Sequence, residues 1–507
     1  MPRDEDLIAP SLPPWTALVG EPGAALTTLD PTDAVLVLPV RDLAELPELL
    51  AGIGLPGSDL LAAHDPGVVT GRVTTIPLPP GRYAVRTVLV VGLGEGSGDD
   101  WRAAGAAVGR ATRERPEVLH VVDEALAEGD LAAYVEGAVL GGWAAPRWTA
   151  GGIRAGVPAT GRRVVLTAPG SEQIVAPAVE RARAQLVARS LATVPPNVKS
   201  PAWLAATARR AARRTGLEVR VWTERDLRRE GFGGLLAVGG GSATPPRLVR
   251  LEYRPQGGSG HEVPHVVLVG KGITFDTGGL QVKPADGMLG MKTDMSGAGI
   301  VLAVLQAARA LDLRVRVTGL LAIAENAVSG SAYRPGDVLT QYGGRTVEIG
   351  NTDAEGRIVL ADALAYAVAE LDPDHLVDIA TLTGAARTAL GRAAAPVFST
   401  DDGLRDALVT AGSASGETVW PMPLPPAYRR GLDSDVADLT HISAGGMAGS
   451  VTAALFLREF VGDRSWAHLD IAGTGRSDVD AGALTKGATG FGTRLLLHWL
   501  EGLGTTR

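Results

Sequence analysis

The stretch "EVPHVVLVGKGITFDTGG", residues 262–279, begins with an aliphatic run and ends with an acid and glycines. An aliphatic run without polar alternation is typical of a strand that is buried on both faces of a sheet. We therefore predict a buried strand over 262–270 and a polar loop directly after it. Because ligands of α/β sheets bind at the carboxyl ends of strands, the chemistry of the protein is expected in this loop.

The same pattern recurs further along the chain. Buried strands are predicted at "VRVTGLLAIA" (315–324), "HLVDIATLTG" (375–384) and "WAHLDIAG" (466–473), with helices at "GIVLAVLQAARALDL" (299–313) and "RIVLADALAYAVAEL" (357–371). Alternating strands and helices favour an α/β domain in which helices flank a central sheet.

An earlier α/β pattern precedes this domain. Strands are predicted at 34–40, 87–93 and 162–170, with a helical stretch at 41–53 and one long amphipathic helix at 172–192 that stops before a proline pair. A chain of 507 residues is longer than one hydrophobic core usually supports. We therefore predict an N-terminal α/β domain over 1–170, a linker helix over 171–197 and a larger C-terminal α/β domain over 198–507.

Composition narrows the classes of protein that fit. Hydrophobic residues make up 45% and charged residues 21% of the chain, which is typical of a folded protein. A net charge of -8 gives no general attraction to nucleic acid or anionic membranes. The absence of cysteine excludes disulfides, thiolate metal sites and cysteine nucleophiles. The acidic start of the sequence is unlike a secretory signal and no stretch is predicted to span a membrane, so we expect a soluble, cytoplasmic protein.

Charged side chains gather after the predicted strands. They are Lys271, Asp276, Lys283 and Asp294 in the first loop, and Asp353, Glu355 and Arg357 in "GNTDAEGRIVL" (350–360). Four carboxylates that share one pocket raise one another's pKa unless cations neutralise them. Two divalent ions would meet that need.

Each of these residues also has a simpler explanation. Asp294 could cap the helix that is predicted to begin near Ser296, and Asp276 could be an ordinary turn residue. The lysines could be solvated, and Glu355 and Arg357 could merely begin a helix. Their joint occurrence among glycines at successive strand ends is what favours a metal site.

Other chemistries find no support in the sequence. The eight histidines are scattered without HExxH spacing, so a histidine-built zinc site is not predicted. The glycine-rich "GLGEGSG" (92–98) lacks the dinucleotide-binding spacing, and "GGGSATPP" (239–246) lacks a Walker lysine. No GxSxG motif indicates a serine hydrolase.

One motif identifies a family: "NTDAEGR" at 351–357 resembles the hallmark of the leucyl aminopeptidase (cytosol aminopeptidase) family of dinuclear metallopeptidases. Further motifs occur in the same order as in this family: "VGKGITFDTGG", "KPADGM", "MKTDMSGA", "SGSAYRPGDV", "DIATLTGA" and "WAHLDIAGT". The detailed resemblance covers about residues 190–500. It implies a smaller N-terminal α/β domain and a larger C-terminal catalytic domain with a central mixed sheet flanked by helices.

The resemblance also implies the metal ligands. Asp276 and Glu355 would bridge two divalent ions, Asp353 would complete one of them, and Lys271 and Asp294 would complete the other. The implied ions are Mn²⁺ or Zn²⁺, with Mg²⁺ as an alternative at one site. A lysine ligand must be neutral, so the ions would have to lower the pKa of Lys271 far below its free value of about 10.4.

The remaining implied roles concern the substrate. Lys283 would act as the electrophile beside the scissile carbonyl, and Arg357 would hold a bicarbonate that shuttles protons. The family's first side-chain pocket maps to Met291, Thr381, Leu382, Gly384 and Ala472, which implies an apolar, leucine-like preference. A further pocket position falls at Gly475, where relatives commonly have something larger.

The implied activity is release of N-terminal residues from short peptides by a water that two metals activate. The resemblance also implies a homohexamer, and we expect no membrane or nucleic-acid partner. Two alternatives stay open: a narrow dipeptide or pathway-specific substrate on the same fold, and a moonlighting DNA-binding protein. The basic stretch "RRAARRTG" (209–216) is more simply explained as a solvated helix face.

Overall fold

The computed structural model describes residues 10, 12–18, 25–26, 34–52, 54–55, 61, 63–79, 82–83, 85–122, 126–150, 152–154, 162–166, 171–256, 263–443 and 445–505. The chain forms two compact units: Met1–Leu186 with Asp478–Gly487, and Val187–Ser477 with Ala488–Arg507. The division falls inside helix α7 (Glu172–Thr193), which contributes residues to both units. The bounds 1–170, 171–197 and 198–507 stay a prediction.

The first unit contains a six-stranded sheet in the order β1-β8-β5-β2-β4-β3. Its strands are β1 (Trp15–Leu18), β2 (Val35–Val40), β3 (Val73–Pro77), β4 (Thr87–Gly92), β5 (Glu117–Val121) and β8 (Arg162–Leu166). Neighbouring strands are parallel except that β3 is antiparallel to β4. The strands predicted at 34–40 and 87–93 are confirmed, and residues 167–170 of the third lie outside the described residues. Helix α3 (Leu46–Gly52) lies within the predicted stretch 41–53.

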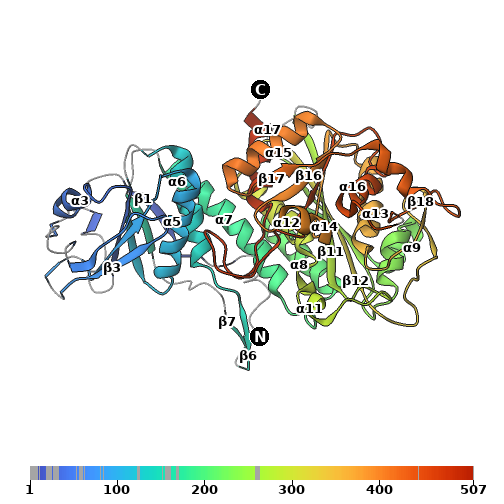
Figure 1. The fold of residues 1–507 in the computed structure, drawn as a ribbon, viewed down its shortest axis with the longest axis horizontal. Helices are drawn as coiled ribbons and strands as arrows, with labels where there is room; N and C mark the ends of the chain where they lie inside the picture. Colours follow the sequence, from blue (N-terminus) through green and yellow to red (C-terminus); the bar gives the residue numbers. More distant parts are fainter. Residues whose placement is uncertain are drawn as a thin grey trace. The chain divides into compact units, whose positions relative to one another are not determined.

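Two helices of this unit, α5 (Gly98–Ala111) and α6 (Glu128–Gly142), pack with their backbones in contact (Figure 1). A Cβ added at Gly105 would lie 2.1 Å from the carbonyl oxygen of Tyr134, and one at Gly141 would lie 2.1 Å from that of Ala106. The glycine-rich stretch 92–98 leads into the capping box of α5, in which Ser97 accepts a hydrogen bond from the backbone N–H of Asp100.

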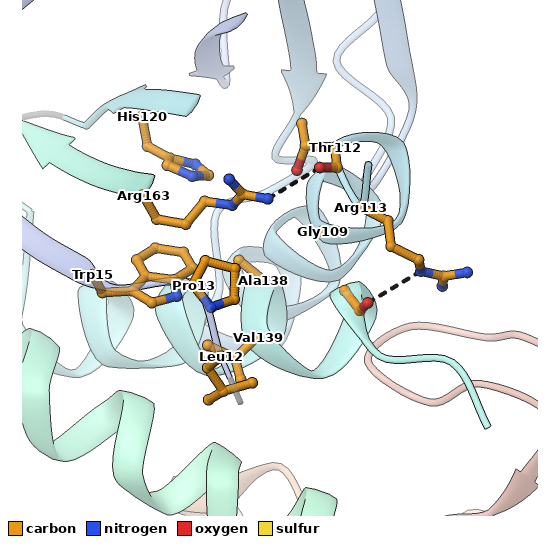
Figure 2. Close-up of a pocket in the computed structure, with 11 residues that line it drawn as sticks. Leu12, Pro13, Trp15, Gly109, Thr112, Arg113, His120, Ala138, Val139 and Arg163 are labelled. Atoms are coloured by element: carbon orange, nitrogen blue, oxygen red, sulfur yellow. Dashed lines mark hydrogen bonds between the residues drawn. The ribbon is translucent and has the colours of Figure 1, made fainter. Parts of the chain in front are cut away.

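A small cavity beside these helices is shown in Figure 2. The ring of Trp15 stacks on His120 with centroids 5.2 Å apart, while Arg163 and Arg113 donate to the carbonyl oxygens of Thr112 and Gly142. The cavity holds about 30 Å³, which is the volume of one liquid water molecule. It is too small to admit a peptide.

The second unit contains an eight-stranded mixed sheet in the order β17-β16-β19-β15-β11-β12-β10-β9. Its strands are β9 (Glu218–Trp222), β10 (Arg247–Tyr253), β11 (His265–Asp276), β12 (Arg316–Asn326), β15 (His375–Ala380), β16 (Ala395–Ser399), β17 (Val419–Pro421) and β19 (Trp466–Asp470). The four strands β19, β15, β11 and β12 are parallel, so their carboxyl ends meet at one edge. The predicted central mixed sheet is confirmed.

Helices cover this sheet in two groups (Figure 1). Helix α12 (Ser296–Ala310) packs with α8 (Pro201–Thr215) and α17 (Thr493–Thr505), and α13 (Glu355–Glu370) packs with α10 (Gly233–Gly239) and α16 (Gly449–Arg458). Helix α12 begins at Ser296, as predicted. The remaining elements are β6 (Arg147–Thr149), β7 (Gly152–Arg154), α9 (Glu224–Glu230), α11 (Ala285–Met288), η1 (Met291–Thr293), β13 (Val338–Thr340), β14 (Thr346–Glu348), α14 (Gly384–Leu390), α15 (Asp402–Ser415), η2 (Pro426–Leu432), β18 (Leu439–Thr440), β20 (Arg476–Ser477) and β21 (Gly487–Ala488).

Two helices test what the sequence predicted of their faces. In α8, Arg209, Arg213 and Arg214 are exposed, so the basic stretch forms the solvated face that was predicted. The helix predicted at 172–192 exists as α7, but it is amphipathic only in its first half, where residues 172, 173 and 176 are exposed and residues 175, 178, 179 and 182 are buried. Every residue from 184 to 194 is buried, because this half of α7 is surrounded by protein on all sides.

The strand predicted at 262–270 is longer than the sequence indicated. Strand β11 continues to Asp276, so Lys271 and Asp276 lie on the strand itself and not in a loop after it. Pairing with β12 persists through an irregularity to the partners Asp276 and Asn326. Gly270 resembles a strand terminator, but a Cβ there would lie 2.5 Å from the carbonyl oxygen of Gly297, so the glycine serves close packing.

One stretch departs from the prediction that no segment is long and apolar enough to span a membrane. Ala285–Ala310 is long and apolar enough to span a bilayer by length and composition, which the sequence analysis did not anticipate. Its most apolar window is 78% buried inside the fold, as is expected of a core helix.

Candidate metal centre

Three carboxylates meet where β11 ends and α13 begins. Asp276 is the last residue of β11, Asp353 lies in the turn before α13, and Glu355 is the first residue of α13. One oxygen from each lies within 4.8 Å of the other two. Asp276 and Glu355 are buried, and Asp353 is partly exposed.

Two lysines and a fourth acid complete the cluster. The Nζ atom of Lys271 lies 3.0 Å from Asp294 Oδ2 and 2.9 Å from Glu355 Oε1. The Nζ atom of Lys283 lies 2.8 Å from Asp276 Oδ2 and also forms an ion pair with Asp353. The structure therefore brings together all five residues that were predicted as metal ligands, and it places Lys283, the predicted electrophile, beside them.

Burial makes this cluster electrostatically costly. Burial, together with the charge of Asp276, raises the pKa of Glu355 to about 8. Burial also raises the pKa of Asp294 to about 6 and raises the pKa of Asp353. Burial opposes the charged form of Lys271, but Asp294, Glu355 and Asp276 outweigh it and raise the pKa of this lysine. The carboxylates are in excess over the cations that the chain itself supplies.

The donor set fits divalent ions. Glu355 Oε2 is buried and accepts no hydrogen bond from any residue in the described part of the chain. Carboxylate oxygens with one amine nitrogen suit Mn²⁺, Mg²⁺ or Zn²⁺. Ligation by Lys271 needs a lowered pKa, and the surrounding acids have the opposite effect, so only added positive charge could reverse the direction.

The simpler explanations for the acids account for only part of the geometry. Asp294 does not cap α12, because the N-cap residue is Met295 and Asp294 Oδ1 accepts a hydrogen bond of 2.7 Å from Thr381 Oγ1. Asp276 does act as a turn residue, since its Oδ1 accepts from the backbone N–H of Gly278 at 2.8 Å. Its Oδ2 faces Lys283, so the turn and the cluster use different oxygens.

Supporting residues that the sequence analysis missed hold the acids in place. Asn326 Nδ2 donates to Asp276 Oδ1 at 2.8 Å and to the carbonyl oxygen of Thr352 at 2.9 Å. The hydroxyl of Tyr333 donates to the same carbonyl at 2.8 Å. A polar residue two positions after the strand predicted at 315–324 was the available signal for Asn326.

A glycine on α13 makes room for the first lysine. A Cβ added at Gly356 would lie 2.6 Å from Lys271 Cε and 2.7 Å from its Nζ. Both distances are too short for a contact, so the end of the Lys271 side chain would have to shift if residue 356 were larger.

Arg357 lies in the first turn of the same helix and is buried. Its Nη1 donates to the carbonyl oxygen of His441 at 2.7 Å, and its buried Nε has no partner in the part of the chain that the structure describes. Burial lowers the pKa of Arg357 to about 10. His441 Nε2 also contacts the carbonyl oxygen of Asn351 at 2.8 Å, which ties residues 441 and 351 together.

A cavity of about 460 Å³ opens beside the cluster. Lys283, Asp353 and Arg357 line one part of it, and Leu382 and Gly384 line another. It is large enough for several amino-acid side chains. The predicted catalytic residues and two of the predicted pocket residues therefore face one space.

The other predicted pocket residues lie around the cluster without lining this cavity. Met291 is in η1, three residues before Asp294, and Thr381 accepts a hydrogen bond from Lys271 Nζ at its carbonyl oxygen, 3.0 Å away. A Cβ added at Gly475 would lie 3.2 Å from Thr381 Cγ2, so little room remains there for a larger residue. Ala472 follows β19 and donates its backbone N–H to Asp470.

Carboxylates and lysines that gather beside the carboxyl end of β11, most of them buried, are typical of an α/β metal-dependent enzyme. Residues 186–497 match the cytosol aminopeptidase family, catalytic domain, and the chain belongs to this family of metal-dependent aminopeptidases.

Known proteins are similar to this one over most of the chain. A probable cytosol aminopeptidase of Streptomyces avermitilis is 44% identical over 85% of this chain and 86% of its own length. One from Roseiflexus castenholzii is 40% identical over 96% and 98%. Among solved structures, the bottromycin maturation enzyme BotP in complex with Mn is 35% identical, with a TM-score of 0.81 over 93% of this chain and 99% of BotP.

Proposed function

We propose that this aminopeptidase releases N-terminal, preferably leucine-like residues from short peptides with two divalent ions in the cluster of Asp276, Asp294, Asp353 and Glu355. The observation that carries the proposal is the buried excess of carboxylates, above all Glu355 Oε2, which accepts no hydrogen bond from the described residues. Asp276, Glu355 and Asp353 would hold one ion, and Asp276, Glu355, Asp294 and neutral Lys271 would hold the other.

The proposed ions are Mn²⁺ or Zn²⁺, with Mg²⁺ as an alternative at one site. The Mn in the BotP complex supports the first choice. When bound, the ions would lower the pKa of a water molecule toward neutrality and polarise the first peptide carbonyl.

The chain's own residues would supply the rest of the chemistry. The ammonium group of Lys283 would stabilise negative charge that develops on the carbonyl oxygen, because it already lies in the cluster and has a fixed position. The buried Nε of Arg357 would donate to a bicarbonate and hold it in place as the group for proton transfer. Neutral Lys271 would keep its contact with the carbonyl oxygen of Thr381.

Met291, Thr381, Leu382, Gly384 and Ala472 are the proposed pocket for the first side chain. The proposal extends to a cytoplasmic homohexamer and to the domain bounds 1–170, 171–197 and 198–507, with catalysis in the last.

A direct test uses protein stripped of metal and then supplied with Mn²⁺ or Zn²⁺. It should hydrolyse leucine p-nitroanilide, and Asp353→Asn should bind less metal and lose activity. A correctly folded, metal-loaded protein without activity on any N-terminal residue would overturn the proposal.

A narrower substrate is the second candidate, and the likeness to a bottromycin maturation enzyme favours it. A dipeptide and short-peptide library separates the two. Broad cleavage with a leucine-like preference supports the first candidate, and cleavage of one or a few sequences supports the second.

A further inference from the structure

Asp470 lies at the end of β19, where two loops of the proposed substrate pocket begin side by side. Strands β19 and β15 are parallel, and Asp470 pairs with Ala380, the last residue of β15. The chain after β15 carries Leu382 and Gly384, and the chain after β19 carries Ala472. The side chain of Asp470 is fully buried.

A single carboxylate binds both loops. Oδ1 of Asp470 accepts from the backbone N–H of Leu382 at 3.0 Å and from that of Ala472 at 3.1 Å. Oδ2 accepts from the backbone N–H of Thr383 at 3.1 Å and from the Thr383 hydroxyl at 2.6 Å. These charge-assisted bonds are stronger than bonds between neutral groups.

The loop after β15 is also bound from its other side. Thr381 donates its hydroxyl to Asp294 Oδ1 and accepts from Lys271 at its carbonyl oxygen. The pocket segment therefore lies between the metal cluster and Asp470. A substitution of Asp470 should alter the pocket, while Thr381 keeps its contacts with Asp294 and Lys271.

A second buried acid on the neighbouring strand provides a contrast. Asp378, on β15, is also fully buried, but it binds Trp466 Nε1 and His468 Nδ1 within the sheet. Neither of these two partners belongs to a pocket loop. Asp470 and Asp378 are therefore equally buried, but they differ in the residues that they bind.

We propose that Asp470 is a positioning residue that sets the shape of the first side-chain pocket, and hence the preference for a leucine-like residue, by binding the backbones of both pocket loops. This inference rests on the proposed function and adds a determinant of specificity that does not itself touch the substrate. In Asp470→Asn one acceptor oxygen becomes an NH₂ group and the negative charge is lost, so the bonds that Asp470 accepts from both loops become fewer and weaker.

The test compares Asp470→Asn with Asp378→Asn in the full chain loaded with Mn²⁺. For Asp470→Asn, the ratio of kcat/KM for leucine over alanine p-nitroanilide should fall about tenfold, mainly through KM for leucine, with metal content unchanged. Hydrogen exchange measured by mass spectrometry should become faster in both segments at once, in the peptides that cover 381–386 and in those that cover 471–475. Asp378→Asn should leave both the ratio and these two peptides unchanged.

A milder pair tests the same bonds if Asp470→Asn does not fold. Thr383→Val removes the hydroxyl that donates to Asp470 and that also accepts from the backbone N–H of Ala386 as the N-cap of α14. Thr383→Ser keeps both bonds, so only the valine variant should lower the ratio. Wild-type ratios and exchange in Thr383→Val, or in a folded Asp470→Asn, would overturn the inference. If the loaded wild type cleaves nothing, the proposed function fails, and the exchange experiment still decides whether Asp470 holds both loops.

Discussion

Both units of this protein bury charged side chains, but they balance the charge differently. In the first unit Glu136 is 1% exposed, with Arg181 Nε 2.8 Å from one oxygen and Arg102 Nε 3.8 Å from the other. In the second unit four acids share Lys271 and Lys283. Buried charges that the chain itself neutralises are structural, whereas a buried excess of one sign needs a partner from solution.

The largest expected effect comes from removing one acid of the excess. Glu355→Gln should lower kcat/KM about 1,000-fold, the equivalent of roughly 4 kcal/mol, because a proposed bridging ligand is lost. The free energy of unfolding without metal should not fall, since the variant removes a repelled charge. Metal content, peptide hydrolysis and denaturant unfolding measure the three quantities.

The matched control is Glu136→Gln in the first unit. It removes the acid that lies 2.8 Å from the buried Arg181, so unfolding should cost roughly 3–5 kcal/mol less, and metal content and kcat/KM should not change. If both variants behaved alike in all three measurements, the contrast between the units would be wrong.

A smaller effect is expected from the space around Lys271. Gly356→Ala places a methyl group 2.6 Å from Lys271 Cε and should displace this ligand, with a loss of about 100-fold in kcat and weaker metal binding. Gly502→Ala, in α17, is the control because its Cβ would meet nothing within 4 Å. Equal activity in the two variants would mean that Lys271 has no role in metal binding.

The excess of acids also predicts how stability without metal depends on pH. The pKa of Glu355 is about 8 in the folded chain against a usual 4.5, and that of Asp294 is about 6 against 3.8. The folded state binds these protons more tightly than the unfolded chain, so their stabilising contribution is present at low pH and is lost as pH rises toward 8. The thermal midpoint of chelator-treated protein should fall over that window, and Mn²⁺ should restore it. Glu355→Gln should make the midpoint depend less on pH. A wild-type midpoint that does not change with pH would contradict the buried excess of carboxylates.

The smallest effect concerns the cavity. A Cβ at Gly384 meets nothing within 4 Å, so Gly384→Ala should fold normally and only take space in the pocket. One added methyl group should change the ratio of kcat/KM for leucine over alanine p-nitroanilide about fourfold. An unchanged ratio would indicate that Gly384 does not belong to the first side-chain pocket.

Much of the fold followed from patterns that are local in sequence. Aliphatic runs located the buried strands, and the apolar stretch before 313 located α12 with its start at Ser296. The end of β11 was misjudged because Gly270 has a long-range reason, the close approach of Gly297, that no local pattern contains. The burial of the second half of α7 on all sides was missed for the same reason.

The sequence by itself determined that the protein has an α/β fold, and its motifs identified a family and named the acids and lysines of the cluster. Only the tertiary structure decided that Asn326 and Tyr333 support those acids and that Asp470 binds the two loops of the proposed pocket. The physical reason is that strand and helix signals depend on neighbours along the chain. Hydrogen bonds such as that between Asp470 and Leu382 join residues 88 positions apart, and only the folded sheet brings them together.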